Sequence, residues 1–418
     1  MLMPDVTRRC FLQTASTAVA LGCYDWGFSA ESPLAMKSTI AKVETYRVSY
    51  PITGYFKFFK SSSDKPPTRD TVVVRITDES GRKGWGQSVP SNTWSYETVD
   101  SAQTTIDRYL GPALIGQNAF DEVGIRRILD KTIAPLYTTG QPIAKAGIDL
   151  ALFDLMGHIL GKSAAERWDR TGGRDRITLS WTLNPQKLDD VGELIAHAQK
   201  AGFHNFNVKI GADAEFDVQV CVEIRKLAPD AFVWIDANGG YDLETALKVT
   251  PRFADLGIAA FEQPMPANRL SWYRELSKQK ALPILMDEPI VSAVDLEEFH
   301  RLGLLDGVAM KLSRCGGLAE SRKVLEYMEE NGLLFFASGL TDPDLSLAGC
   351  LALFGAYNLE HPAALNAPQF LSGSILSEPL MIEGDQATVP RGPGLGVQVS
   401  PAKLEELQSP ISQLKRSR

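Results

Sequence analysis

Short apolar runs alternate with amphipathic segments from about residue 176 onward, and no other feature of the sequence constrains the fold as strongly. The apolar runs are ITLSWTL, NFNVKIG, AFVWIDAN, AAFEQP, PILMDEP, DGVAMKLS, LLFFASG and a final candidate, AALNAP. The segments between them, such as DDVGELIAHAQKAG, have the spacing of helices with one apolar face. Strands that alternate with helices predict a parallel sheet. Seven or eight such units, without a GxGxxG after a strand, favour an α/β fold of the closed (β/α) barrel type over an open nucleotide-binding sheet.

The region before the predicted barrel has a different pattern. Residues 38–90 alternate with a period of two, which is typical of strands, and residues 97–168 change to a helical period. Strands followed by helices predict an α+β unit. We therefore expect an α+β domain over 38–168, a catalytic barrel over 169–378, and a final segment, 379–418, that packs back on the first domain.

The predicted barrel strands end on charged residues. In chain order these residues are Lys209, Asp236, Glu262, Asp287, Lys311 and Asp342. The first five follow one another at intervals of 24 to 27 residues, about one strand and helix each, so they lie on consecutive strands. In a parallel barrel the C-terminal strand ends form the one face at which active sites are built. We therefore expect these side chains around a single cavity.

Three of them, Asp236, Glu262 and Asp287, form a candidate metal site. Neighbouring carboxylates do not all stay ionised without a compensating cation. Ligands that are all oxygen favour Mg²⁺, with Mn²⁺ as the alternative, and no Cys or His cluster in the sequence suggests zinc. Asn238 and Glu288 are expected to orient the three ligands. Each acid taken singly is as consistent with a helix cap, but the three together favour the metal.

Lys209 and Lys311 precede and follow the acids, so a closed barrel would place them across the cavity from one another. A lysine near a metal ion in a low-dielectric site has its ammonium form disfavoured, which suits it to act as a base. A lysine that only extends its stem along a strand end is the alternative. The glycine pair in KLSRCGG allows close approach of the backbone and favours the base at Lys311.

These positions resemble the enolase superfamily, and its muconate-lactonizing branch in particular. The resemblance covers roughly residues 38–400 and rests on NVKIG, DANGG, FEQP, DEP and KLSRCGG, with AKAGIDLALFDLMG and VPRGPGLGV outside the ring. It implies a modified (β/α)7β TIM-like barrel with an α+β capping domain. It also implies removal of a proton next to a carboxylate, with the resulting enediolate held on Mg²⁺.

Three positions depart from the family pattern. Asn207 stands where the family usually has the first lysine of a Lys-x-Lys pair, which removes a positive neighbour of Lys209. Asp342 stands at the seventh strand end, where Glu is frequent, and is our candidate for a third catalytic residue. Asn366 ends an Ala-Leu-Asn that replaces the Asp-x-Asp of dipeptide epimerases, which argues against a bound dipeptide ammonium.

We assign substrate binding to Trp181, Lys57 and Asn366. Trp181 belongs to SWTL, which is similar to the first barrel strand of muconate cycloisomerases, and Lys57 lies in the aromatic and lysine-rich loop 53–69. The resemblance favours a cycloisomerase or racemase/epimerase reaction on a small carboxylic acid. An acid dehydratase or an o-succinylbenzoate synthase-type lyase is one alternative, and a catalytically inactive exported relative that binds metal and carboxylate is another.

Composition narrows the choice of partners. A formal net charge of −8 makes nucleic acid a poor partner. The five cysteines are unpatterned and describe neither a disulfide framework nor a CxxC zinc site. No stretch is long and apolar enough to span a membrane as a mature helix. The expected partners are a small carboxylate substrate and further copies of the chain in a homo-oligomer.

Residues 1–37 are expected to be an export signal. TRRCFLQTASTAVALGC, with Arg8 and Arg9 before a short apolar run, resembles the twin-arginine signal and predicts a periplasmic protein cleaved after Ala30. ALGC, which ends at Cys23, resembles a lipoprotein box more weakly and leaves lipid anchoring as the alternative.

Overall fold

The N-terminal part of the described chain is an antiparallel sheet covered by helices. The computed structural model describes residues 36–54, 56, 58, 67–136 and 139–409, and Lys37–Arg418 form one compact unit. The sheet has the order β1 (Ile40–Pro51), β2 (Thr68–Asp78), β3 (Lys83–Ser88). The helical elements that follow are α1 (Val99–Thr105), a π-helical turn η1 (Ile106–Leu110), α2 (Gly111–Leu114), α3 (Glu122–Thr132) and α4 (Pro142–Leu160).

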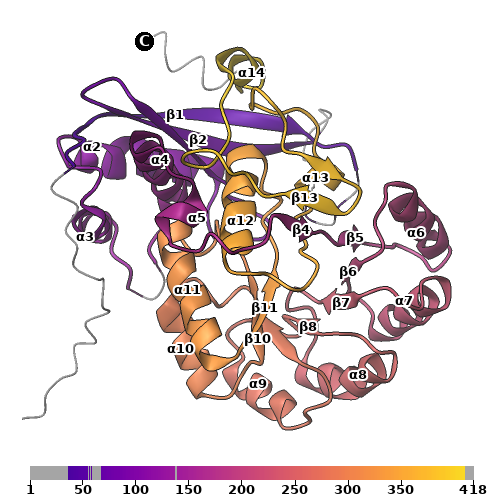
Figure 1. Cartoon of the computed structure of the whole chain (residues 1–418). Helices are drawn as coiled ribbons and strands as arrows, with labels where there is room; N and C mark the ends of the chain where they lie inside the picture. The colour runs from indigo at the N-terminus through magenta and orange to yellow at the C-terminus, as the bar shows by residue number, and fades with distance from the viewer. Residues whose placement is uncertain (1–35, 55, 57, 59–66, 137–138, 410–418) are drawn as a thin grey trace, which may run out of the picture. The chain divides into compact units, whose positions relative to one another are not determined.

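Helix α4 is apolar on nearly every side because it is buried on nearly every side. It packs directly against β3, and Figure 1 shows it beside β2. A Cβ atom at Gly86 of β3 would lie 2.1 Å from the carbonyl oxygen of Gly147 of α4. The backbones of β3 and α4 are therefore in direct contact at these two glycines. Between the sheet and the helices lies a core that includes Val72, Val74 and Ile76 of β2 with Ile148 and Leu155 of α4.

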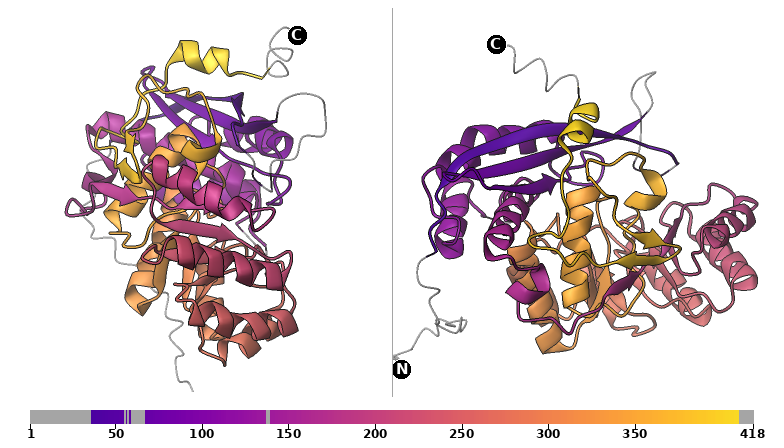
Figure 2. Two further views of the ribbon diagram at one scale, coloured as in Figure 1. Left: turned by 90° about the vertical axis from the view of Figure 1, so that its right-hand side faces the viewer. Right: turned by 45° about the horizontal axis from the view of Figure 1, so that its top comes forward.

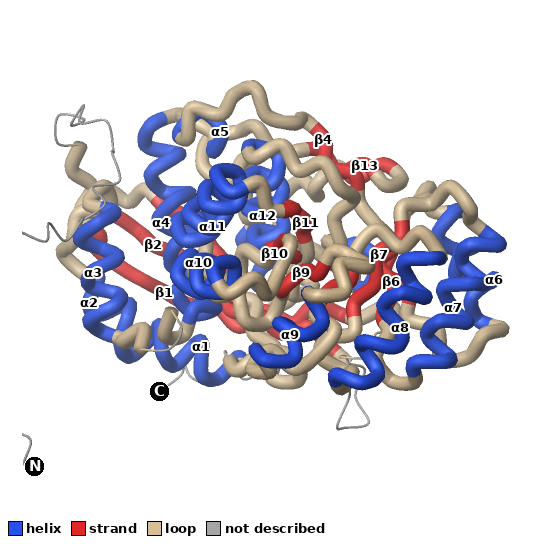
Figure 3. The backbone as a smooth tube through the Cα atoms, turned by 90° about the horizontal axis from the view of Figure 1, so that it is seen from below, coloured by secondary structure: helices blue, strands red, loops and turns tan. Residues whose placement is uncertain are grey.

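Seven parallel strands, each followed by a helix, build the barrel. Their order in the sheet is β11-β10-β9-β8-β7-β6-β5. Residues 363–364 close it, through parallel bridges from Ala363 to Leu179 and from Ala364 to Ser338. Figure 3 shows helices outside the strands. The strands are β5 (Trp181–Leu183), β6 (Phe206–Lys209), β7 (Val233–Asp236), β8 (Phe261–Glu262), β9 (Ile284–Met286), β10 (Gly307–Met310) and β11 (Leu334–Ala337). The helices are α6 (Asp190–Lys200), α7 (Ala214–Leu227), α8 (Leu243–Asp255), α9 (Leu270–Ser277), α10 (Ala293–Arg301), α11 (Leu318–Asn331) and α12 (Asp344–Ala356).

Local signals fix where several barrel helices begin. The side chains of Asp213, Asp242 and Ser292 accept hydrogen bonds from backbone N–H groups in the first turns of α7, α8 and α10. Inside the barrel an apolar plug fills the lower layer, made of Trp234, Ala260, Leu285, Ala309, Phe336 and Ala364. The predicted TIM-like barrel is therefore confirmed, and its interior is open to chemistry only above this plug.

The remaining elements connect the barrel to the N-terminal sheet. They are α5 (Ala164–Arg167), β4 (Arg176–Thr178), α13 (Ala367–Phe370), β12 (Ile382–Glu383), β13 (Gln386–Thr388) and α14 (Pro401–Glu406). Strand β13 pairs with β4 and β12, and the chain then returns to β1, where the amide of Ser49 donates to Leu407 O at 2.9 Å. Figure 2 shows α14 (yellow) beside the long strands β1 and β2 (indigo). No helix in the described ranges is both long and apolar enough to cross a bilayer.

Candidate active site

Five charged side chains stand around the C-terminal end of the barrel. Lys209, Asp236 and Glu262 are the last residues of β6, β7 and β8, and Asp287 and Lys311 directly follow β9 and β10. All five are buried, with exposed fractions between 0% and 6%. In the closed barrel three strands separate β6 from β10 in either direction, so the two lysines enter from opposite sides. The structure thus brings these predicted site residues to one edge; we call them the strand-end ring.

The ring is held together by ion pairs. The Nζ atom of Lys209 lies 2.5 Å from Asp236 Oδ2. The Nζ atom of Lys311 lies 2.5 Å from Asp287 Oδ2 and 3.3 Å from Glu262 Oε1. Asp287 also accepts from Nη1 of Arg314, a buried residue that the sequence reasoning did not assign. Each carboxylate therefore faces a cationic group.

The donor atoms of the ring fit a Mg²⁺ ion. As the side chains stand, no group of three His, Cys, Asp or Glu residues converges in metal-binding geometry within the described ranges, since ammonium groups hold the carboxylates. However, Glu262 Oε2 is buried without a hydrogen-bond partner in the described chain. Burial, and the nearby charge of Asp236, raise the pKa of Glu262 well above its usual range. Three adjoining strands thus present oxygen ligands only, the donor type that Mg²⁺ prefers.

The protonation of Lys311 differs from the expectation for a base next to a metal ion. Burial lowers the pKa of Lys311, but the charges of Asp287 and Glu262 more than offset burial, and the net direction is upward. The physical reason is that two carboxylates lie close to the Lys311 ammonium group, Asp287 Oδ2 at 2.5 Å and Glu262 Oε1 at 3.3 Å. A cation that shares their charge would weaken this effect.

Asn238 holds Asp236, the first of the candidate ligands, through two hydrogen bonds. Its backbone amide donates to Asp236 Oδ1 at 2.8 Å and its Nδ2 atom donates to Asp236 Oδ2 at 3.0 Å. The same Nδ2 lies 3.4 Å from Glu288 Oε1. Burial and the charge of Asp287 raise the pKa of Glu288 to about 7. Asn238 adopts a left-handed backbone conformation, with φ of 47°, which places both of its nitrogen atoms on one carboxylate.

Gln263 is a positioning residue that the sequence reasoning missed. Its Oε1 atom accepts from the backbone amides of Asp287, at 3.0 Å, and Glu288, at 3.2 Å. Its Nε2 atom donates to Met265 O at 2.9 Å and to Tyr273 Oη at 2.7 Å. Its φ of 39° is uncommon for a residue other than glycine, and such conformations gather at functional sites. The signal was present in FEQP, but the reach of Gln263 to β9 is a tertiary fact.

Trp94, also missed from the sequence, lies over both lysines. Its ring centroid is 5.8 Å from Lys209 Nζ and 5.1 Å from Lys311 Nζ, within the range of cation–π attraction. Trp94 stacks on Phe58 with centroids 4.5 Å apart, and Phe56 stacks on Phe370 at 4.9 Å. We call Phe56, Phe58, Trp94 and Phe370 the aromatic cover. Three of its members come from loops of the N-terminal region, so that region contributes directly to the barrel mouth.

Asp342 is engaged in a supporting network. It accepts hydrogen bonds from Ser313 Oγ at 2.5 Å, Ser346 Oγ at 2.6 Å and the amide of Leu340 at 2.6 Å. Ser313 belongs to the loop that carries Lys311. Asp342 therefore supports the loop of Lys311, and its catalytic role stays a prediction.

Trp181 points away from the barrel interior. Its ring contacts His197 and Phe203, with centroids 5.5 and 4.9 Å apart, on the side of α6. Because side chains alternate along a strand, its neighbours Ser180 and Thr182 face the interior instead. This position does not fit the substrate-binding role that we expected for Trp181. Lys57 lies outside the described residues, and Asn366 is buried at the barrel interior, where its Nδ2 atom donates to Thr182 Oγ1 at 3.3 Å.

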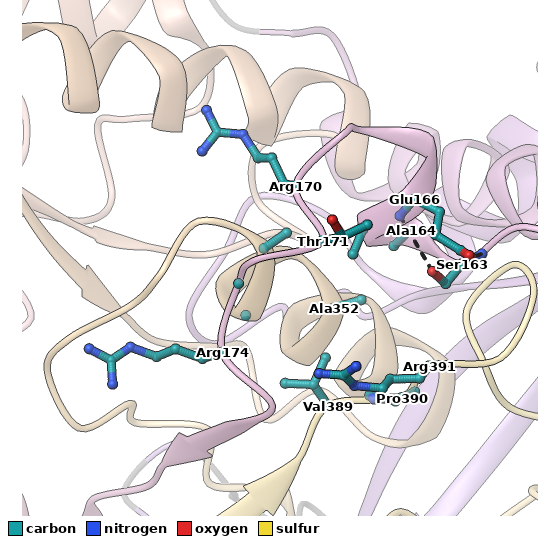
Figure 4. A pocket seen from close by; sticks show the side chains of 14 residues that line it. Ser163, Ala164, Glu166, Arg170, Thr171, Arg174, Ala352, Val389, Pro390 and Arg391 are labelled. Carbon is teal, nitrogen blue, oxygen red and sulfur yellow. Dashed lines mark hydrogen bonds between the residues drawn. The ribbon is translucent and has the colours of Figure 1, made fainter.

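A hollow of about 310 Å³ lies apart from the ring (Figure 4). It is lined by α5, the end of α12 and the segment after β13. Two of its three arginines are in ion pairs: Arg170 Nη2 lies 2.7 Å from Glu329 Oε2, and Arg391 contacts Asp175. None of its lining residues contributes to the buried side-chain atoms that lack a partner in the described chain. Such atoms gather around the ring, which remains the candidate site.

Comparisons with known proteins agree with this geometry. Residues 190–403 match the family described as "Enolase C-terminal domain-like", and residues 57–166 match "Mandelate racemase / muconate lactonizing enzyme, N-terminal domain". The chain is 32% identical to the chloromuconate cycloisomerase of Cupriavidus necator over 80% of this chain and 90% of that protein. It is 26% identical to the L-Ala-D/L-Glu epimerase of Bacillus subtilis (strain 168), over 86% and 96%. The crystal structure of 2-chloromuconate cycloisomerase from Rhodococcus opacus 1CP superposes with a TM-score of 0.80 at 25% identity, over 90% of this chain and 100% of that one.

Proposed function

This chain belongs to the muconate cycloisomerase-like branch of the enolase superfamily and is an isomerase, and we propose that it moves a proton next to the carboxylate of a small organic acid. Asp236, Glu262 and Asp287 would hold Mg²⁺. When bound, Mg²⁺ supplies positive charge to the substrate carboxylate, which makes the neighbouring hydrogen more acidic.

This proposal rests on the positions of two buried lysines: Lys209 is the last residue of β6, and Lys311 directly follows β10. A substrate between them would present one face of its reacting carbon to Lys209 and the other to Lys311. One lysine can then remove the proton while the other returns it, which is the requirement for racemisation or epimerisation. The aromatic cover would exclude bulk water from the ring.

Cycloisomerisation is the second candidate, favoured by the 32% identity to a chloromuconate cycloisomerase. In that reaction a single lysine transfers the proton, and the other stabilises charge. Lys209 is the better candidate for the base, because it lies beside Asp236 on the next strand.

Exchange of the α-hydrogen in D₂O tests the proposal. The purified protein with Mg²⁺ should replace the hydrogen next to the carboxylate of a substrate by deuterium, followed by NMR. Chelation should stop the exchange, and Mg²⁺ or Mn²⁺ should restore it. A panel of α-substituted acids, lactones and their enantiomers that shows no exchange at any metal concentration would contradict the proposal.

Export by the twin-arginine route is a proposal, because Arg8, Arg9 and Cys23 lie outside the described residues. Self-association of the chain is a proposal as well. Replacing both arginines by lysine should leave folded protein in the cytoplasm, measured by cell fractionation. Unchanged export would remove the targeting proposal.

A further inference from the structure

One side of the barrel interior, next to Lys209, is lined by uncharged polar side chains. Thr182 and Asn207 are register partners in neighbouring strands β5 and β6, and Asn366 donates to Thr182 Oγ1. Alternation along each strand makes Asn207 share the interior with Lys209, and Ser180 share it with Thr182. We call Ser180, Thr182, Asn207 and Asn366 the amide wall.

The amide wall contains buried polar atoms without partners in the described chain. Asn207 is 0% exposed, and neither its Nδ2 nor its Oδ1 atom makes a hydrogen bond. The same holds for Oδ1 of Asn366 and for Oγ of Ser180, which are also buried. Buried polar groups in proteins are nearly always paired, so an unpaired amide that faces an active site indicates a partner from outside the chain.

The charges of the wall's surroundings limit what this partner can be. Residues 178–184 and 363–366 contain no charged side chain. Lys209 on β6 is in an ion pair with Asp236, and in the proposed function its amine is directed at the reacting carbon. Arg314 comes from the loop after β10, on the opposite side of the barrel, and is paired with Asp287. A second carboxylate against the amide wall would therefore be buried without a free opposite charge.

Hydrogen-bond chemistry points in the same direction. Whichever way the Asn207 amide is turned, it presents one donor end and one acceptor end. A carboxylate only accepts and would leave the acceptor end unpaired, whereas a neutral amide satisfies both ends. We propose that the substrate is a monocarboxylate whose far part carries a neutral amide, which binds to the amide wall; this inference rests on the proposed function at the ring.

A matched pair of ligands tests the inference: adipate and its monoamide, which have the same length and differ in one charge. With Mg²⁺ present, calorimetry should show the monoamide binding at least about tenfold more tightly.

Asn207→Leu should remove this preference, because leucine has a similar volume to asparagine but makes neither hydrogen bond. Asn207→Lys should reverse it in favour of adipate, which gives a second variant should the leucine protein fail to fold. Asn205→Leu is the control, since Asn205 donates to Asp385 at 3.4 Å and is not part of the wall; it should keep the wild-type ratio.

The two proposals fail differently. Equal affinities, tighter binding of adipate, or no binding of either ligand to the wild-type protein overturns the amide inference, even if α-hydrogen exchange is observed with other acids. A preference for the monoamide that Asn207→Leu abolishes, without exchange of its α-hydrogen, supports the amide wall and counts against the proposed function.

Discussion

The two sides of the barrel mouth differ in the charge of their polar groups, although both contain buried atoms without a partner in the described chain. On the side of β7, β8 and β9, three carboxylates are held by lysines and by an arginine, with Asn238 and Gln263 fixing their positions. On the side of β5, β6 and residues 363–366, an uncharged wall leaves an entire asparagine amide unpaired. The first side has the properties of a site built for a common chemical step. The second has the properties of a site that awaits a particular ligand. The two sides meet at β6, which carries both Lys209 and Asn207.

The largest expected effect is the loss of turnover when either of the two lysines is replaced, and it shows whether the two lysines have equivalent roles. Lys209→Ala and Lys311→Ala should each lower turnover on the order of 10²–10⁴-fold, because each removes a group that transfers a proton. In a racemase each variant should still exchange the α-hydrogen of one enantiomer. In a cycloisomerase the losses should be unequal, with the larger loss at Lys209. Exchange in D₂O followed by NMR measures both. Lys248→Ala, at an exposed lysine of α8, is the control, and wild-type rates in both ring variants would rule the mechanism out.

A smaller effect is expected when the support of the charged side is removed. Gln263→Leu deletes the acceptor that holds the amides of Asp287 and Glu288, so the affinity for Mg²⁺ should fall about 10–100-fold. Calorimetric titration with Mg²⁺ measures this loss. Gln386→Leu, far from the ring on β13, should bind Mg²⁺ as the wild type does. Unchanged affinity in Gln263→Leu would show that β9 positions its carboxylates without help from β8.

The aromatic cover joins the two sides, and its removal should have an intermediate effect. Trp94→Leu removes the ring that faces both Lys209 and Lys311, and kcat/KM should fall about tenfold. The matched control is Trp272→Leu on α9, whose ring meets Arg269 instead. A Trp94 variant with wild-type kcat/KM would mean that the cover plays no part in closing the site.

Glu97, near Trp94 in the chain, is expected to affect the stability of the fold and to have the smallest effect on activity. Its oxygens accept from the amides of Ile143, at 2.7 Å, and Ala144, at 2.9 Å, at the start of α4. Burial raises the pKa of Glu97 from 4.5 to about 7. Between these values the native state holds the proton more tightly than the unfolded state does. The free energy of unfolding should therefore fall as pH rises from about 4.5 to about 7, by about 3 kcal/mol at most, and level off above.

Urea unfolding across this pH window measures the fall, and Glu97→Gln should flatten it because glutamine does not titrate. The exposed Glu79→Gln should keep the wild-type slope. A slope unchanged in Glu97→Gln would assign the pH dependence to another group.

The sequence by itself determined the barrel and the charged half of its mouth. Alternating strand and helix patterns leave few topologies open, and parallel strands bring residues at equal positions in successive units to one edge. Lys209, Asp236, Glu262, Asp287 and Lys311 could be found for this reason, because their spacing repeats with the fold. Asn238 could be found because it is two residues from the carboxylate that it orients.

Tertiary structure decided the rest, because the remaining roles depend on contacts that have no period in the sequence. Trp94 reaches the lysines from a loop of the N-terminal region more than a hundred residues away in the chain. Trp181 and Thr182 differ by one position, yet the pleat of β5 sends one outward and the other inward. Asp342 was expected at a strand end like the others, but β11 ends at Ala337 and the hydroxyl groups of Ser313 and Ser346 donate to Asp342. The unpaired amide of Asn207 is visible only in space, since a missing partner is a property of everything that surrounds a side chain.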